Sequence, residues 1–364
     1  MDRRLLQIGL TIVPLVLALA ATALLIVLLE SDPIRVAETA WSGAFADTRR
    51  LASVFNFWIP LVLAGIGLAV TFTAGLWNIG IEGQMVMGAI FASWGAQFID
   101  LPNMALIPVC VALAMLGGML WALLAGLLKT RFGVHEIFGG VALNFIALNV
   151  AIYLISGPWQ PPEGGSAQAT PPFPAQARLG YPSSDFQVNL FFLALVAVAI
   201  VGIAQMLRGT RWGLMLKATG KNARSALLLG VPTERVSLSA FAVCGLLAGI
   251  AGAHRVLHTY SSLRPSPAGG IGFLALLVVL LVAYRAWWVP FMAFALAAVI
   301  AGSTRVKILL QLDQSLAGVL QGMIVLMILL FNGVKARLLP PPKNDQADEP
   351  AQPVPRAEKE TPSP

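Results

Sequence analysis

One short stretch of the chain combines chemically reactive side chains with residues that break helices. Gly75 to Gln84 reads Gly-Leu-Trp-Asn-Ile-Gly-Ile-Glu-Gly-Gln, and long apolar runs flank it on both sides. A carboxylate such as Glu82 costs about 3 kcal/mol at membrane depth unless it has a partner, a watery cavity or an interfacial position. Helices interrupted by glycine are tolerated in membranes where their freed backbone lines a cavity. A solute pathway is therefore the first hypothesis for this stretch.

A second informative stretch is the charged loop at 208–235, which contains signals for the start and end of a short helix. Asn222 suits the N-cap position, Gly230 suits the position just after the C-cap, and Pro232 prevents the helix from continuing. We expect a short amphipathic helix here. The start and stop signals favour a docking element over a plain positively charged loop.

The composition shows what kind of protein must position these stretches. Of the 364 residues, 57% are apolar and only 11% are charged, whereas soluble chains carry about 25% charged residues. The sequence therefore predicts an all-α, polytopic membrane protein with one membrane domain at 1–339. The net charge of +7 fits the membrane topology, and we do not attribute it to nucleic-acid binding. Cys110 and Cys244 lie inside apolar runs, and neither a disulfide framework nor a metal pattern is expected.

About ten apolar runs are long enough to cross a bilayer core about 30 Å thick. The candidates are 5–29, 57–76, 79–98, 104–128, 137–156, 187–207, 236–257, 272–287, 288–304 and 314–332. The 272–304 region can instead hold a broken or re-entrant segment. The run after Arg3 and Arg4 continues well past a weak cleavage-like site at Ala18 to Ala20, which favours an uncleaved first span.

The distribution of Lys and Arg predicts which loops lie inside the cell. More of these residues fall in the loops that would be cytoplasmic if both termini were cytoplasmic. The 208–235 loop then faces the cytoplasm, whereas the Pro- and Gly-rich 157–186 loop lies outside. The outer segment 30–56 is expected to contain a short interfacial helix near 37–45. The tail at 340–364 lacks periodicity and is predicted to be disordered.

The two motifs together resemble one family. The Asn-Ile-Gly-Ile-Glu-Gly-Gln run at 78–84 is followed at 218–226 by Ala-Thr-Gly-Lys-Asn-Ala-Arg-Ser-Ala and at 230–232 by Gly-Val-Pro. This pattern is similar to permease subunits of bacterial ATP-binding-cassette (ABC) importers of the branched-chain amino acid and simple-sugar superfamily. The nucleoside or purine branch matches best, over about 40–335. The first motif is the more specific one.

The resemblance implies partners and roles for individual residues. It implies a second permease chain (the same or different), two cytoplasmic ATPase subunits that bind ATP and Mg, and an extracytoplasmic solute-binding lipoprotein in a bacterial inner membrane. No cofactor is expected on this chain, because Gly220-Lys221-Asn222 lacks the rest of a phosphate-binding loop. The segment 217–231 would couple to the ATPases. The residues concerned are Lys217, Gly220, Asn222, Arg224 and Gly230 for coupling, and Asn78, Glu82, Gln84 and Asn144 for the substrate pathway.

Several alternatives remain open at this point. Glu82 can contact a sugar hydroxyl of the substrate or cap the N-terminus of a neighbouring half-helix, and the structural role is slightly favoured. Asn144 and Asn149 can line the pathway or join helices, and their spacing does not place them on one face. Simple sugars and branched-chain amino acids remain alternative substrates, although a ribose-type solute is disfavoured by the first motif.

Other function classes lack the residues that they would need. An ion-driven transporter needs titratable groups at membrane depth, and only Glu82 is a serious candidate. An intramembrane enzyme needs a catalytic cluster, which is not evident in the spans. His254 and His258 have the spacing of metal ligands, but their place at a predicted span end favours a solvated interfacial pair. His135-Glu136 does not continue as a zinc-protease motif, because position 139 is Gly.

Overall fold

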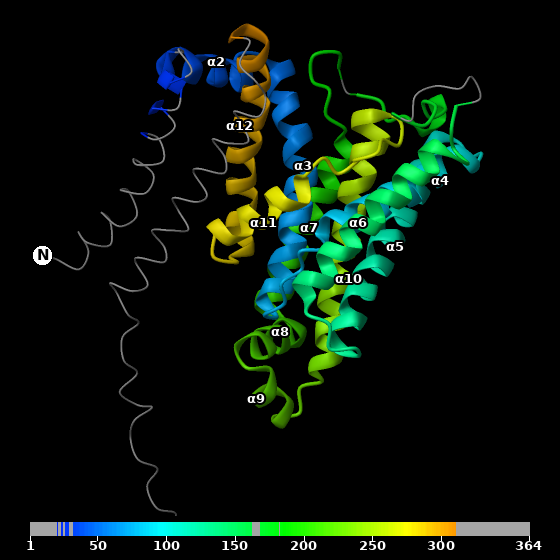
Figure 1. Cartoon of the computed structure of the whole chain (residues 1–364), viewed down its shortest axis with the longest axis vertical. Helices are drawn as coiled ribbons and strands as arrows, with labels where there is room; N and C mark the ends of the chain where they lie inside the picture. The colour runs from blue at the N-terminus through cyan, green and yellow to red at the C-terminus, as the bar shows by residue number, and fades with distance from the viewer. Residues whose placement is uncertain are drawn as a thin grey trace, which may run out of the picture.

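The computed structural model describes residues 32–161, 168–181 and 183–310, and a few single residues between 20 and 28. These parts of the chain form helices joined by turns, with no strand among them (Figure 1). The helices are α2 (Pro33–Phe45), α3 (Thr48–Thr73), α4 (Ile81–Phe98), α5 (Asn103–Thr130), α6 (Glu136–Ser156), α7 (Leu190–Gly209), α8 (Arg211–Lys221), α9 (Ala223–Leu228), α10 (Thr233–His254), α11 (Ile271–Leu281) and α12 (Val289–Leu310). The all-α prediction is confirmed.

Eight of the ten expected spans fall in the described residues, and all eight contain a helix. Six helices are long and apolar enough to cross a membrane, namely α3, α5, α6, α7, α10 with its continuation to Tyr260, and α12 with the turn before it. Helix α4 has 18 residues but contains Glu82, Gln84 and Gln97, and it is not among these six. Helix α11 has only 11 residues, a length of about 16 Å. The expected spans at 5–29 and 314–332 and the tail at 340–364 lie outside the described residues.

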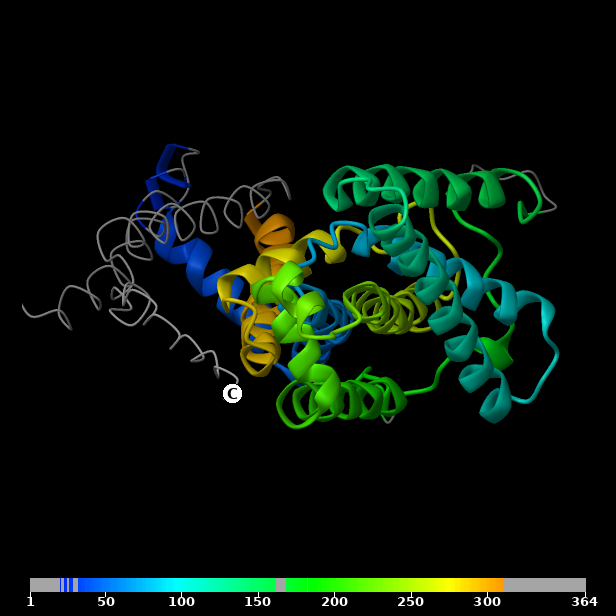
Figure 2. The ribbon, with the colours of Figure 1, turned by 90° about the horizontal axis from the view of Figure 1, so that it is seen from below.

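Helix α10 occupies the centre of the bundle, between α3 on one side and α4 and α5 on the other (Figure 2). Glycines allow its backbone to approach α5 closely. A Cβ atom on Gly118 would lie 2.8 Å from the backbone nitrogen of Gly249, closer than real Cβ contacts. Gly245 and Gly249, four residues apart on α10, both meet the backbone of α5, as small residues do where helices pack closely.

The break between α3 and α4 arises at a glycine. Gly75 adopts a left-handed φ of +73° just after α3 ends, a conformation that side chains with a Cβ rarely take. The chain then turns through Asn78 and begins α4 at Ile81. The stretch with helix-breaking residues between the second and third expected spans is therefore a tight turn.

Helix α11 is a half-helix at mid-height of the bundle (Figure 1). Gly270, with a φ of +81°, precedes it, and the left-handed residues Ala283 and Tyr284 follow it. A short 3₁₀ turn at Ala286–Trp288 leads into α12. The expected span at 272–287 is thus too short to cross, and the broken-helix alternative describes this region correctly.

The expected short helix near 37–45 is present as α2, and part of the 157–186 loop is described. Asp32 accepts a hydrogen bond from the Ile34 backbone nitrogen at 2.9 Å and starts α2, which lies across one end of the bundle and packs against α12 (Figure 1). The 168–181 part of the predicted outer loop pairs with 261–263, because the Thr170 backbone nitrogen donates to the Leu263 carbonyl at 3.0 Å. Helices α8 and α9 lie at the opposite end of the molecule from this loop.

Candidate functional site

Glu82 lies in the first turn of α4, is 2% exposed, and binds the start of α11. Its two carboxylate oxygens accept hydrogen bonds from the backbone nitrogens of Gly270 and Gly272, both at 2.8 Å. The first N–H groups of a helix have no partner within the helix and carry partial positive charge. The carboxylate therefore caps α11, which is the structural role that the sequence slightly favoured.

Asn144 caps another buried helix start from a neighbouring helix. The N-cap residue of α4 is Gly80, which has no side chain to cap the helix. The Asn144 side-chain oxygen, on α6, accepts a hydrogen bond from the Gly83 backbone nitrogen at 2.8 Å, and its amide nitrogen donates to the Ile79 carbonyl at 2.9 Å. Asn149 is exposed on the same helix, so the two asparagines face different sides, as their spacing predicted.

Asn78 and Gln84 form a closed amide pair beneath these caps. The Asn78 amide nitrogen donates to the Gln84 side-chain oxygen at 3.1 Å, and the Gln84 amide nitrogen donates to the Asn78 side-chain oxygen at 2.9 Å. The Asn78 amide also lies 3.1 Å from the sulfur of Cys244 on α10. Both amides are almost fully buried, so they join the α3–α4 turn to α4 and α10.

The structure thus brings all four predicted pathway residues together around the start of α4. Each is buried and bonded within the protein. Buried polar groups with complete hydrogen bonding rigidify their surroundings. Their hydrogen bonds connect α4, α6, α10 and α11. Contact of these four residues with a solute stays a prediction.

The predicted coupling segment contains two helices instead of one. Asn222 caps α9 as expected, because its side-chain oxygen accepts from the Ser225 backbone nitrogen at 3.0 Å, and Gly230 has the expected left-handed φ of +84°. A separate helix, α8, precedes it. Thr210 caps α8 by accepting from the Gly213 backbone nitrogen at 3.1 Å, and this cap is the signal that the sequence reasoning missed.

The tip of this segment exposes apolar side chains. Leu227 is 59% exposed, and Leu228 and Leu229 are each 84% exposed. Lys217 and Arg224 are also exposed, on α8 and α9. The three consecutive leucines were a visible signal in the sequence, but only the fold shows that the α9 tip turns them outward instead of burying them.

Gly220 at the end of α8 touches the glycine that breaks α3. A Cβ atom on Gly75 would lie 3.2 Å from the Cα of Gly220, and a Cβ on Gly220 would lie 3.0 Å from the Gly75 backbone nitrogen. The two sequence motifs therefore meet at a contact between backbones. A cavity of about 330 Å³ lies beside this contact and is bordered by Lys129 and Glu234.

Charged pairs surround this end of the molecule. Lys129 binds Glu136, and Arg131 donates to Glu234 at 2.8 Å. The carboxylate of Glu234 raises the pKa of the exposed Arg131 guanidinium. These pairs connect the ends of α5, α6 and α10 near α8.

The histidine pair corrects one sequence interpretation. His254 is fully buried and His258 is 6% exposed, so they are not a solvated interfacial pair. Helix α10 continues as a π-helical turn from Arg255 to Tyr260, which keeps both rings inside the bundle. The His258 Nε2 lies 3.0 Å from the side-chain oxygen of Asn56 on α3. Among the described residues, no cluster of three potential metal ligands includes them.

Arg255, the residue after α10, is a buried cation. It is 5% exposed, and its Nε donates to the Pro267 carbonyl at 3.3 Å. It also bonds the hydroxyl of Tyr260. Arg255 thereby holds the loop that delivers Gly270 and Gly272 to Glu82.

Known proteins similar to this chain are transporter permeases. The glucose ABC transporter permease protein TsgB13 of Haloferax volcanii is 28% identical over 329 residues, which are 88% of this chain and 87% of that protein. The guanosine ABC transporter permease protein NupP of Bacillus subtilis is also 28% identical, over 77% of this chain and 81% of its own length. The nucleoside ABC transporter permease protein NupB of Lactococcus lactis is 28% identical over 69% of this chain and 71% of its own length.

A family model gives the same answer over a continuous stretch. The model described as branched-chain amino acid transport system, permease component, matches residues 50–330. This range includes the Glu82 cap, the amide pair and both helices of the coupling segment. The resemblance seen in the two motifs is confirmed. The chain is a multi-pass membrane protein that belongs to the family of permease components of branched-chain amino acid transport systems.

Proposed function

We propose that this chain is a permease subunit of an ABC importer that carries nucleosides or purines. The first support is the guanosine and nucleoside specificity in the names of two relatives. The second is the sequence at 78–84, which resembles the nucleoside branch. Nucleosides are neutral and need few charges along their path. The satisfied, buried state of Glu82 fits a pathway without a free carboxylate.

The proposal assigns the α8–α9 segment to the contact with a cytoplasmic ATPase. Leu228 and Leu229 expose apolar surface that a partner would cover. ATP and Mg belong on that partner. We further propose that both chain termini lie on the cytoplasmic side with α8 and α9. A second permease chain and a solute-binding lipoprotein would complete the importer.

The observation that carries the mechanism is the contact of Gly75 with Gly220. ATP binding draws the ATPases together and moves α9 with α8. The backbone contact transmits this movement to the α3–α4 turn, and the Asn78 and Gln84 pair transmits it to α4. Glu82 then moves the start of α11. A half-helix displaced in this way changes which side of the pathway is open.

Uptake by the complete importer tests the substrate. The permease chains, ATPases and binding protein are reconstituted in liposomes, and ATP-driven uptake of radiolabelled guanosine is competed by nucleosides, free bases, glucose, ribose and leucine. The proposal expects nucleosides or purine bases to compete most strongly. Strong competition by leucine alone, with none by nucleosides, would contradict it.

Glucose is the second candidate substrate because TsgB13, which matches 88% of this chain, is named as a glucose permease. Labelled glucose in the same liposomes distinguishes the two. ATP-dependent glucose uptake that guanosine does not inhibit would assign the chain to sugar transport. The coupling mechanism above would be unaffected by that result, because it rests on α8, α4 and α11.

A further inference from the structure

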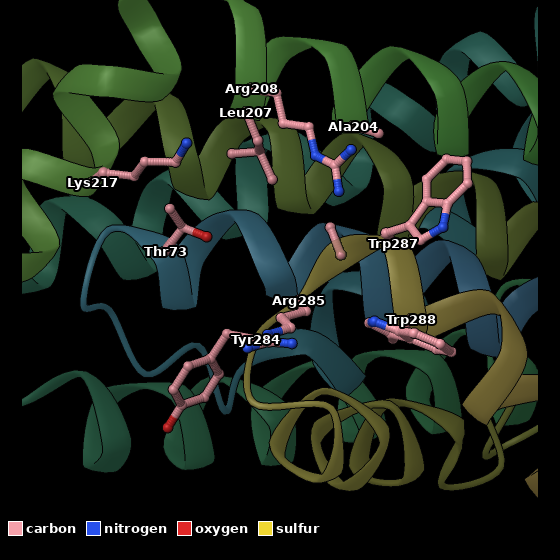
Figure 3. A pocket seen from close by; sticks show the side chains of 10 residues that line it. Thr73, Ala204, Leu207, Arg208, Lys217, Tyr284, Arg285, Trp287 and Trp288 are labelled. Atoms are coloured by element: carbon pink, nitrogen blue, oxygen red, sulfur yellow. The ribbon is translucent and has the colours of Figure 1, made fainter. Parts of the chain in front are cut away.

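A pocket of about 400 Å³ opens where the end of α7, α8 and the turn after α11 meet (Figure 3). Arg208 comes from the last turn of α7 and Lys217 from α8, and both lie on one side of the space in Figure 3. Tyr284, Arg285 and Trp287 come from the turn between α11 and α12. Three cations from three separate segments therefore border one hollow.

None of these three cations has a negative partner in the part of the chain that the structure describes. The side chains of Arg208, Lys217 and Arg285 form neither ion pairs nor hydrogen bonds there. The Arg208 guanidinium lies 5.8 Å from the ring centre of Trp287 as its one aromatic contact. Like charges gathered without a counter-ion repel each other, and an anion between them relieves this repulsion.

The turn that carries Arg285 has an unusual backbone. Ala283 and Tyr284 both adopt left-handed φ values, 49° and 63°. Such values are uncommon for residues other than glycine and persist only where the surrounding structure imposes them. Strained backbone is often found at ligand sites, and here it lies in the turn whose residues Tyr284 and Arg285 line the pocket.

An apolar groove continues from the pocket. Arg285 and Trp288 border both spaces, and the groove of about 470 Å³ is otherwise lined by apolar side chains, including Leu281 and Phe291. Trp287 and Trp288 are 49% and 54% exposed. Exposed tryptophans at the ends of spans mark the membrane interface. The cationic pocket thus lies at headgroup depth, and the groove extends along the start of α12.

We infer that this pocket binds an anionic phospholipid. The lipid phosphate occupies the space between Arg208, Lys217 and Arg285, and one acyl chain follows the groove beside Phe291. Basic pockets between membrane helices bind anionic headgroups by the same physical means. The bound lipid connects α8 to the turn after α11, which are the two ends of the coupling path proposed above.

Native mass spectrometry of the assembled importer tests this inference. The complex, with its ATPases, is titrated with phosphatidylglycerol and with phosphatidylcholine of the same acyl chains. Phosphatidylglycerol is expected to bind more tightly. The double variant Arg208→Gln with Arg285→Gln should lower its affinity about thirtyfold, which corresponds to about 2 kcal/mol. The single variant Arg285→Gln should lower it about fivefold and serves if the double variant does not assemble.

Arg211→Gln is the matched control, because Arg211 is exposed on the same segment and does not line the pocket. It should retain the affinity of the unmodified complex for phosphatidylglycerol. Equal binding of the two lipids, or unchanged affinity in the Arg285→Gln complex, would overturn the inference. Inorganic phosphate is titrated as a separate arm. Tight phosphate binding without retained lipid would also overturn it, because the pocket would then hold a free anion.

Discussion

Two regions of this molecule differ from the usual distribution of side chains: one buries polar groups, and the other exposes apolar ones. Around Glu82, a carboxylate and three amides lie inside a membrane bundle. At the α9 tip, Leu228 and Leu229 are 84% exposed outside the bundle. The first region has its partners within the chain: backbone N–H groups donate to Glu82 and Asn144, and Asn78 and Gln84 bond each other. The second region has no such partner in the described residues.

The difference teaches where each region acts. A polar cluster that is complete in one chain holds that chain in shape, since water is absent and every helix start needs an acceptor. An apolar tip that is exposed to solvent in a single chain marks a surface that a second protein would cover. The contact of Gly75 with Gly220 joins the two regions. A movement of the exposed tip at α9 can therefore be transmitted to the buried polar cluster around Glu82.

The largest effect is expected from removing the carboxylate. Glu82→Ala leaves the backbone nitrogens of Gly270 and Gly272 without acceptors, which costs about 2–6 kcal/mol at about 1–3 kcal/mol per group. Thermal unfolding of the purified complex measures the loss, and uptake should be abolished. Glu82→Gln keeps one acceptor oxygen and should lose less. An Ala variant as stable as the unmodified protein would show that the cap is not structural.

A smaller loss of stability is expected when Asn144, which caps α4 from the neighbouring helix α6, is replaced. Asn144→Ala removes the acceptor for the Gly83 backbone nitrogen and should cost about 1–3 kcal/mol of stability. Asn149→Ala on the same helix is the matched control, because Asn149 is exposed and bonds only within α6. The control should unfold within about 0.5 kcal/mol of the unmodified protein, as exposed substitutions usually do. Equal losses in both variants would remove the distinction between the two asparagines.

The external tip should respond in binding and not in stability. Leu228→Ser removes an exposed apolar side chain, and its transfer to a covered surface contributes about 1.5 kcal/mol. Affinity of the permease for its ATPase partner should fall about tenfold, measured by pull-down titration or surface plasmon resonance in detergent. The unfolding temperature of the permease should not change. If the Leu228→Ser permease binds the ATPase with unchanged affinity, the α9 tip is not part of the ATPase contact.

The smallest effect is expected where a weak acceptor supports the internal cluster. Cys244 contributes only its sulfur to Asn78, which also bonds Gln84. Sulfur is a weak acceptor, so Cys244→Ala should cost about 1 kcal/mol or less beyond its lost packing. Thermal unfolding checks this value against that of Asn144→Ala. A loss as large as that of Asn144→Ala would mean that the cluster depends on the thiol.

Some features of these regions can be predicted from local sequence signals, and others depend on residues far away in the chain. Local signals sufficed for the α9 cap at Asn222, for Gly230 after it, and for a helix break within the Gly75 to Gln84 stretch, because each depends on a few neighbouring residues. The role of Glu82 required α11, which lies 188 residues away along the chain. Sequence reasoning offered a half-helix cap as one of two roles but had no means to identify the helix.

Other features depended on packing that no local pattern reveals. The histidines were assigned to an interface because the predicted span ended at 257, whereas a π-helical turn carries them back into the bundle. Helix α11 looked like a full span because its composition is apolar throughout, and only the left-handed residues at 283 and 284 end it early. The meeting of Gly75 and Gly220 is likewise a consequence of how α3 and α8 pack.

The ratio of solute imported to ATP hydrolysed in the Gly220→Ala importer tests the central claim most directly. The added methyl group collides with the Thr73 carbonyl and the Gly75 nitrogen, so the backbones must separate. Gly209→Ala is the control, because a Cβ there meets nothing within 4 Å. We predict that Gly220→Ala retains assembly and ATP hydrolysis while uptake per ATP falls at least about tenfold, a change of about 1.4 kcal/mol. A Gly220→Ala importer with the transport ratio of the control would contradict coupling through this contact.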